Sequence, residues 1–292
     1  MPVDSVVSMS RAVGPVGLSR FPCWFSNNNP TDTIHNMSSN ILFHEIENLA
    51  ASQLSDYRSN NPGTCFSTPG FNIDITAAYN VQDAVTKLRV ESGERVIGYK
   101  VGCTGPGTRA QFGMDGPIRG TLFEDEALSN GAHINPDEFC QLAIEGEMAV
   151  KVGENGQIEA AFPVIELHNF VFRADRKTLS ELIANNGINA GIVLPDIEWQ
   201  QATNYIRCEA SLSLRINGSE IGDAGLWPND AGPEASLHWV SDNLRHAGIK
   251  LVPGDIVLAG TALGLYPVRD GDEIIVCIDG EPTVSCKIKT VR

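Results

Sequence analysis

Apolar positions recur with helical spacing in two segments of the first hundred residues and then give way to short β-type runs. From Met37 to Leu54 the apolar residues fall on roughly one face, which predicts a helix with Ser39 or Asn40 as its N-cap. A second helix is predicted from Ile75 to Ser92, where apolar residues keep helical spacing up to an S-G-E break. Both segments are expected to lie at the periphery of the fold.

Runs rich in β-branched residues follow, separated by Gly, Pro and Asn, as is typical of short strands joined by turns. The predicted strands are residues 96–101, 145–152, 161–167, 190–194, 209–216, 255–259 and 273–278. Further helices are predicted at residues 176–184 and 234–247. Because the strands do not alternate regularly with crossover helices, this order predicts an α+β fold with a mixed, mostly antiparallel β core and peripheral helices.

The pattern divides the chain into three parts. Residues 1–36 carry Ser, Pro, Gly and a run of Asn without periodicity, so they are predicted to form an irregular arm. Residues 37–95 are expected to form an N-terminal helical segment, and residues 96–292 the catalytic β domain. No internal repeat is visible.

The acidic composition narrows the function classes. The formal net charge is -15, which opposes approach to nucleic acid and makes an anionic substrate dependent on a bound cation or a local basic side chain. Seven cysteines without a C-x-x-C pair argue against a disulfide framework and fit a reducing compartment. Without a membrane-spanning apolar run or a secretory signal, the chain is expected to be cytoplasmic.

Three acidic residues on apolar runs are the candidate metal ligands. In L-A-I-E-G-E-M-A-V-K-V, Glu145 and Glu147 would point to the same face of a strand and repel each other unless a hard cation such as Mg²⁺ or Mn²⁺ lies between them. Exposure on an edge strand is the alternative explanation. Glu166 stands between Ile165 and Leu167, where a buried acid needs a partner or a cation.

Two basic side chains are candidates for proton transfer. Lys100 lies in G-Y-K-V-G, where the flanking glycines let the backbone approach a ligand closely; a surface lysine is the alternative. His168 would project on the same strand face as Glu166, either as a general acid or base or as a structural partner. No G-x-S-x-G elbow or cysteine nucleophile motif supports nucleophilic hydrolysis.

The order of several motifs carries a family resemblance from about Asp74 to the C-terminus. G-Y-K-V-G, M-D-G-P-I-R-G-T-L-F, I-E-G-E-M-A-V, V-I-E-L, P-G-D-I-V-L-A-G-T-A-L-G and V-R-D-G-D resemble the 2-oxopent-4-enoate hydratase and 4-oxalocrotonate decarboxylase branch of the fumarylacetoacetate hydrolase superfamily. The resemblance implies a β-roll core, a Mg²⁺ or Mn²⁺ ion, a homo-oligomer and a small 2-oxo or 2-hydroxy-dienoate acid as substrate.

The resemblance also implies roles for the candidate residues. Glu145, Glu147 and Glu166 become the metal ligands, and Lys100 becomes the catalytic or substrate-positioning lysine. Asp115 matches an acid of the M-D-G-P loop and is expected to share proton transfer with Lys100 or His168.

Three segments depart from the pattern of this branch. Ile118 replaces an acid implicated in proton transfer, residues 168–171 replace a segment that usually carries S-R, and residues 185–188 replace D-N-A-S. The resemblance makes a hydratase or its decarboxylase sibling the main hypothesis, and an acylpyruvate hydrolase is one alternative. The departures motivate a second alternative, a homologue without catalysis.

Overall fold

The computed structural model describes residues 43–61, 64–104, 117–171, 177–228 and 231–291, all of them within one compact unit from Ser38 to Arg292. The predicted arm and the predicted start of the first helix lie outside these residues. Two helices open the described part, α1 (Phe43–Arg58) and α2 (Ile75–Glu91). The second agrees with its prediction to one residue, and the Asp74 side chain caps it by accepting a hydrogen bond from the Ala77 N–H at 2.7 Å.

The remaining helices are short apart from one. They are α4 (Leu179–Ala184), α5 (Ile197–Gln200) and α6 (Gly232–His246). Within the described residues, no helix is long and apolar enough to cross a membrane.

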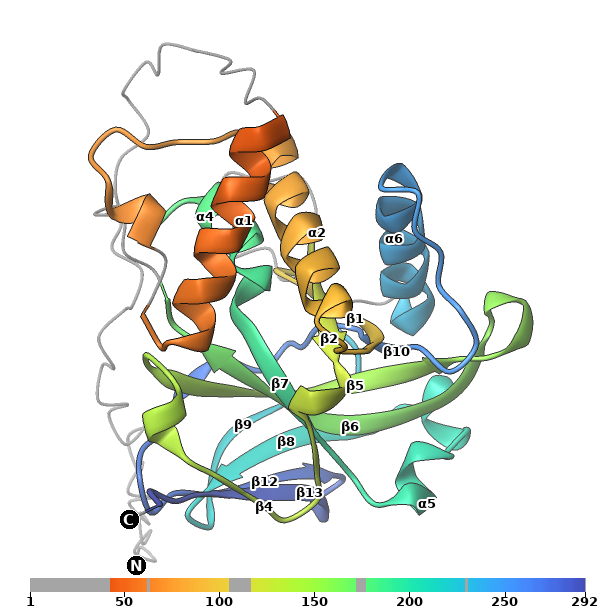
Figure 1. Ribbon diagram of the computed structural model, residues 1–292. Coiled ribbons are helices and arrows are strands. Elements are labelled where there is room, and N and C mark those ends of the chain that lie inside the picture. The colour runs from red at the N-terminus through yellow and green to blue at the C-terminus, as the bar shows by residue number, and fades with distance from the viewer. Residues whose placement is uncertain (1–42, 62–63, 105–116, 172–176, 229–230, 292) are drawn as a thin grey trace, which may run out of the picture. The chain divides into compact units, whose positions relative to one another are not determined.

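A large sheet organises the fold, with strand order β2-β1-β10-β5-β6-β7-β3 and β11 beside β5 (Figure 1). Its strands are β1 (Val96–Gly102), β2 (Ile118–Phe123), β3 (Ala127–Ser129), β5 (Leu142–Val152), β6 (Ile158–Asn169), β7 (Asn189–Leu194), β10 (Ile256–Leu258) and β11 (Tyr266–Pro267). β10 is the parallel neighbour of β1 and the antiparallel neighbour of β5, so it joins segments far apart in the sequence.

A second sheet packs against the first, with order β4-β13-β12-β8-β9. Its strands are β4 (Ala132–Ile134), β8 (Ser211–Ile216), β9 (Ser219–Gly225), β12 (Glu273–Ile278) and β13 (Glu281–Ile288). Among the pairings of the described strands, only β1 with β10, β4 with β13 and β3 with β7 are parallel. The expected mixed, mostly antiparallel core is confirmed.

Side-chain alternation along β5 separates the two faces of the large sheet. Ile144, Met148 and Val150 join the core between the two sheets, as predicted. The intervening side chains of Glu145 and Glu147 therefore project from the opposite face.

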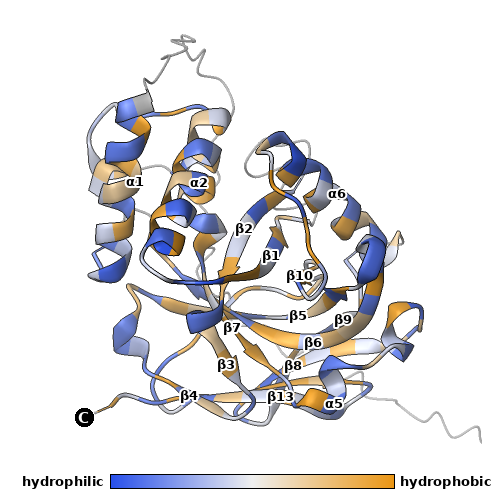
Figure 2. Cartoon of the chain, turned by 45° about the vertical axis from the view of Figure 1, so that its right-hand side comes forward, coloured by the Kyte–Doolittle hydropathy of each residue, from blue (hydrophilic) through white to orange (hydrophobic). Residues whose placement is uncertain are grey.

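That opposite face is covered by α1, α2 and α4, which lie together above the large sheet in Figure 1. Their apolar residues form a second core with parts of β2 and of the α4–β7 connection. Figure 2 shows hydrophilic and hydrophobic residues mixed along α1 and α2, in keeping with helices that bury one side, whereas β6 is largely hydrophobic. A charged group beneath these helices is thus shielded from solvent.

Candidate metal and proton-transfer site

Three strands of the large sheet bring together the residues of an acidic cluster, defined here as Lys100, Glu145, Glu147, Glu166 and His168. Lys100 lies on β1, the first two glutamates on β5, and the last two residues on β6. The sequence prediction that these five residues share one site is consistent with this arrangement. Four of them are 2–3% exposed, and the Glu145 side chain is 22% exposed, so the cluster opens to solvent on the Glu145 side.

Glu145 and Glu166 are direct partners in the register of β5 and β6. Opposed like charges on adjacent strands destabilise a sheet unless something compensates them. Lys100 supplies part of the compensation, because its Nζ donates a hydrogen bond to Glu166 Oε1 at 2.8 Å. His168 supplies more, since its Nε2 lies 3.1 Å from Glu145 Oε2 and 3.4 Å from Glu166 Oε2.

Burial and neighbouring charges act against each other on Lys100 and Glu166. Burial by itself lowers the pKa of Lys100, but the carboxylates of Glu166 and Glu145 outweigh it and raise that pKa. Burial likewise raises the pKa of Glu166, and the charges of His168 and Lys100 reverse the effect and lower it. Both groups are therefore held in their charged forms.

Glu147 lacks such compensation. Burial raises its pKa well above the ordinary value, and the charges of Glu166 and Glu145 raise it further. Its Oε1 is buried without a hydrogen-bond partner. A carboxylate in this position is stable as the neutral acid or beside a cation.

Among the described residues, the ligand atoms that lie within 4.8 Å of one another belong to Glu145, Glu166 and His168. The ligand set expected from the sequence was Glu145, Glu147 and Glu166. Glu147 faces the same space but stands outside this closest group, and His168 stands inside it.

The stem of Lys100 is enclosed by backbone and by an apolar side chain. A Cβ atom on Gly187 would lie 2.9 Å from Lys100 Cε, and one on Gly120 would lie 3.0 Å from Lys100 Cγ. Ile118 lies beside this stem, since it borders Gly102 and Gly187, which the stem also borders. Ile118 stands where the family pattern carries an acid, so the side chain beside Lys100 at this position is apolar. Asp115 lies outside the described residues, and its role stays a prediction.

The turn at Asn186–Ile188 has an unusual backbone. Asn186, Gly187 and Ile188 all have φ near +60°, which is costly for a β-branched residue. The Asn186 side chain holds the turn against β2, accepting a hydrogen bond from the Thr121 N–H at 2.6 Å and donating one to the Thr121 carbonyl at 2.9 Å. This contact fixes the wall beside Lys100.

Sequence reasoning missed Asn189, which lies at the start of β7. Its Nδ2 donates to Glu166 Oε1 at 2.8 Å, so Asn189 and Lys100 together orient that carboxylate. A buried amide at the head of the apolar run A-G-I-V-L was the available indication.

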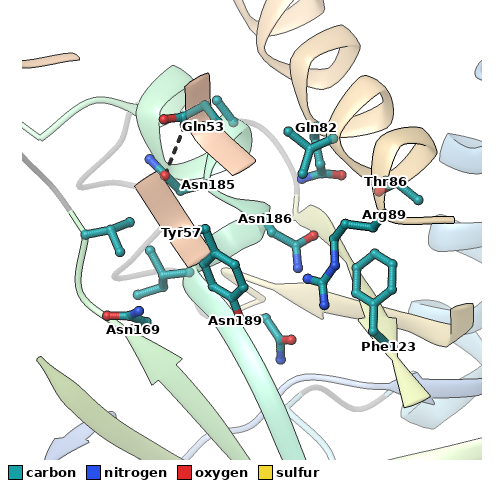
Figure 3. Close-up of a pocket in the computed structure, with 14 residues that line it drawn as sticks. Gln53, Tyr57, Gln82, Thr86, Arg89, Phe123, Asn169, Asn185, Asn186 and Asn189 are labelled. Carbon is teal, nitrogen blue, oxygen red and sulfur yellow. Dashed lines mark hydrogen bonds between the residues drawn. The ribbon is translucent and has the colours of Figure 1, made fainter. Parts of the chain in front are cut away.

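A small cavity lined in part by Asn189 lies between the helices and the large sheet (Figure 3). Its volume is about 40 Å³, room for a few water molecules. Polar side chains around it already have partners. Gln53 donates to Asn185, and Arg89 pairs with Glu94 and Glu126, which do not line the cavity. We therefore assign it a packing role and no ligand.

Comparisons with known proteins bear on the fold and on the class of reaction. No family model matches the chain. Among curated proteins, the TodF product hydratase of Pseudomonas putida is 28% identical over 228 residues, covering 73% of this chain and 83% of the relative. The 2-oxo-hept-4-ene-1,7-dioate hydratase of Escherichia coli is 27% identical over 235 residues, covering 74% and 87%.

Among solved structures, 4-oxalocrotonate decarboxylase from Pseudomonas putida G7, complexed with magnesium and adipate, superposes with a TM-score of 0.76. It is 18% identical and covers 84% of this chain and 97% of its own. The fold is that of this decarboxylase. The resemblance to 2-oxopent-4-enoate hydratases and 4-oxalocrotonate decarboxylase that the sequence predicted is confirmed, because the similar curated proteins are hydratases of this kind.

Proposed function

We propose that this chain is a divalent-cation-dependent lyase that adds water to a small 2-hydroxy-dienoate or 2-oxo acid, in the manner of a 2-oxopent-4-enoate hydratase. The observation that carries the proposal is the buried pair of Lys100 and Glu166. Glu166 lies directly opposite Glu145 on the neighbouring strand. The curated relatives, which are hydratases, support the reaction class.

The acidic cluster fits Mg²⁺ or Mn²⁺. Glu145, Glu147 and Glu166 supply oxygen donors on one face of two strands, and the unpartnered Glu147 Oε1 needs a cation or a proton. Three carboxylates, one ammonium group and a dication leave no net charge in a site that is largely buried. When bound, such a cation supplies Lewis-acid stabilisation of negative charge on the carboxylate and 2-oxygen of the acid.

Lys100 is the proton-transfer or substrate-positioning residue of this proposal. Its Nζ is held on Glu166 Oε1, and Asn189 fixes the same oxygen from the other side. Ile118 cannot transfer a proton, and among the described residues Lys100 is the basic side chain beside it. Asp115 is the proposed second proton-transfer group. The substrate would enter from the Glu145 side, where the cluster is exposed.

We propose a cytoplasmic homo-oligomer. The cysteines support the reducing compartment, since none of those in the described residues forms a disulfide.

The test follows 2-hydroxypenta-2,4-dienoate by loss of the dienol absorbance with added Mg²⁺ or Mn²⁺, and again with chelator. We expect metal-dependent consumption that yields a hydrated product with the carbon chain intact. Glu145→Gln is expected to reduce turnover by at least about 100-fold, whereas Glu154→Gln, at an exposed position, keeps it. Full activity in chelator would refute the metal requirement.

The decarboxylase sibling is the second candidate, because a solved decarboxylase shares the fold. Release of CO₂ from a substrate with an additional carboxylate, together with no consumption of the dienoate, would favour it. Cleavage of an acylpyruvate carbon chain is not favoured by the relatives.

A further inference from the structure

The imidazole of His168 is packed between two carboxylates of the acidic cluster. Its Nε2 lies 3.1 Å from Glu145 Oε2 and 3.4 Å from Glu166 Oε2, and the side chain is buried. The nitrogen therefore occupies the same small volume as the two oxygens that face each other across β5 and β6.

These spacings match those of ligands around a cation. Adjacent ligands of an octahedral ion with bonds of about 2.1 Å lie about 3.0 Å apart. The convergence is not limited to pairs. The ligand atoms of Glu145, Glu166 and His168 all lie within 4.8 Å of one another, so a single ion placed between them could contact all three.

We propose that His168 Nε2 is itself a metal ligand, together with Glu145 and Glu166, and that this nitrogen donor shifts the preference of the site from Mg²⁺ towards Fe²⁺ or Co²⁺. Carboxylates suit Mg²⁺ and Mn²⁺, whereas an imidazole favours first-row transition metals. The inference rests on the proposed function only in using the same metal site. It replaces the acid-base role expected for His168 from the sequence, because a coordinated nitrogen cannot transfer a proton.

The decisive test is pulsed electron paramagnetic resonance of the full-length protein loaded with less than one equivalent of Mn²⁺. We expect modulation from a directly coordinated histidine nitrogen, and we expect it to change when the protein is produced with ¹⁵N-labelled histidine. It should persist in His133→Gln, at an exposed position of β4, and disappear in His168→Gln. A wild-type spectrum without histidine nitrogen coupling overturns the proposal, and this measurement decides even if His168→Gln fails to fold.

Metal selectivity provides the second readout. By calorimetry, His168→Gln is expected to weaken Co²⁺ binding by about tenfold or more and Mg²⁺ binding by less, so the ratio of the two affinities falls. If His168 is only an ionic partner of the carboxylates, its removal changes both affinities together and leaves the ratio unchanged, which overturns the proposal.

The outcomes for the ligand and for the reaction are separate. Histidine coupling without consumption of any dienoate would uphold the ligand assignment and refute the hydratase. Metal-dependent hydration without histidine coupling would uphold the hydratase and refute the ligand assignment.

Discussion

Lys100 and Glu166 are two opposite charges that are both almost fully buried. Moving either charge out of water is expensive, and each is stable there only because the other is present. The pair is therefore better understood as a device for holding an ammonium group at a fixed point than as a source of stability. A surface pair such as Lys151 with Glu159 has no comparable role, because solvent screens it.

Lys100→Met is expected to reduce kcat by about 100-fold or more, because it removes the proposed proton-transfer group. It should also lower the free energy of unfolding by about 3 kcal/mol, since the buried charge of Glu166 loses the ammonium group that balances it. Steady-state kinetics and urea unfolding measure the two effects. Lys151→Met is the control and should change stability by less than about 1 kcal/mol; equal effects of the two substitutions would contradict the prediction.

At the scale of elements, Arg119 joins three parts of the fold. It extends from β2, and its guanidinium bonds both carboxylate oxygens of Asp83 and the amide of Gln82 on α2. Its Nε donates to Asn243 on α6 at 2.7 Å. A single buried side chain thus ties two separate helices to one strand, and no packing of apolar residues reproduces this set of contacts.

Arg119→Met is expected to destabilise the protein by about 3–5 kcal/mol, because it leaves buried polar groups on α2 without their partner. Amides of α2 and α6 should lose protection from hydrogen exchange together. The matched control is Arg95→Met, which breaks an exposed pair with Glu124 and should cost less than about 1 kcal/mol. Loss of protection in α2 alone would show that Arg119 does not couple the helices.

A second set of ionic contacts links α1, α2 and the turn before β1, and it makes stability depend on pH. Burial opposes the charge of Glu94, but hydrogen bonds from Arg89 and Arg58 outweigh it and lower the pKa of Glu94 below the ordinary 4.5. A carboxyl with a lowered folded-state pKa contributes stability above its unfolded pKa, and this contribution is lost as the pH falls through the folded value.

Stability is thus expected to decrease as the pH is lowered from about 5 to below 4, and Glu94→Gln should make that decrease shallower. Urea unfolding at pH 6, 5, 4 and 3 measures it. Glu91→Gln serves as the control, because that residue makes only an exposed contact with Lys87, and it should follow the wild-type curve. Parallel curves for wild type and Glu94→Gln would exclude Glu94 as a contributor.

At the scale of the whole molecule, the acidic cluster makes global stability depend on the bound cation. A ligand that binds only the folded state stabilises it by about 2.7 kcal/mol at 100 times its Kd. Without the cation, the buried charge of Glu147 opposes folding, since burial and two neighbouring carboxylates disfavour it.

Glu147→Gln is therefore expected to raise the Tm in chelator and to abolish most of the increase that Mg²⁺ or Mn²⁺ produces in the wild type. Differential scanning calorimetry with chelator and with each metal measures both effects. Glu138→Gln, an exposed position, should leave the metal-dependent increase intact. An undiminished increase in Glu147→Gln would remove Glu147 from the ligand set.

Local patterns predicted the longer strands that are rich in apolar residues, and with them the two faces of β5. They missed β2, β9 and β13, because Arg119 interrupts the first, the second has few apolar residues, and Pro282 lies in the third. They also missed β3, β4 and β11, which have only two or three residues each. Register between distant segments is not encoded locally, and neither the insertion of β10 between β1 and β5 nor the bond from Asn189 to Glu166 could be deduced. That Glu166 and His168 point to the same face could be deduced from the sequence, because their i, i+2 spacing depends on one strand alone.

Every residue of the acidic cluster, and Asn189 beside it, lies within a strand of the large sheet. Strands vary little when neighbouring loops gain or lose residues. Exchange of the connecting segments between relatives should therefore alter which acids are accepted while the reactive groups keep their positions. For protein engineering, this makes the chain a candidate recipient for loop grafts.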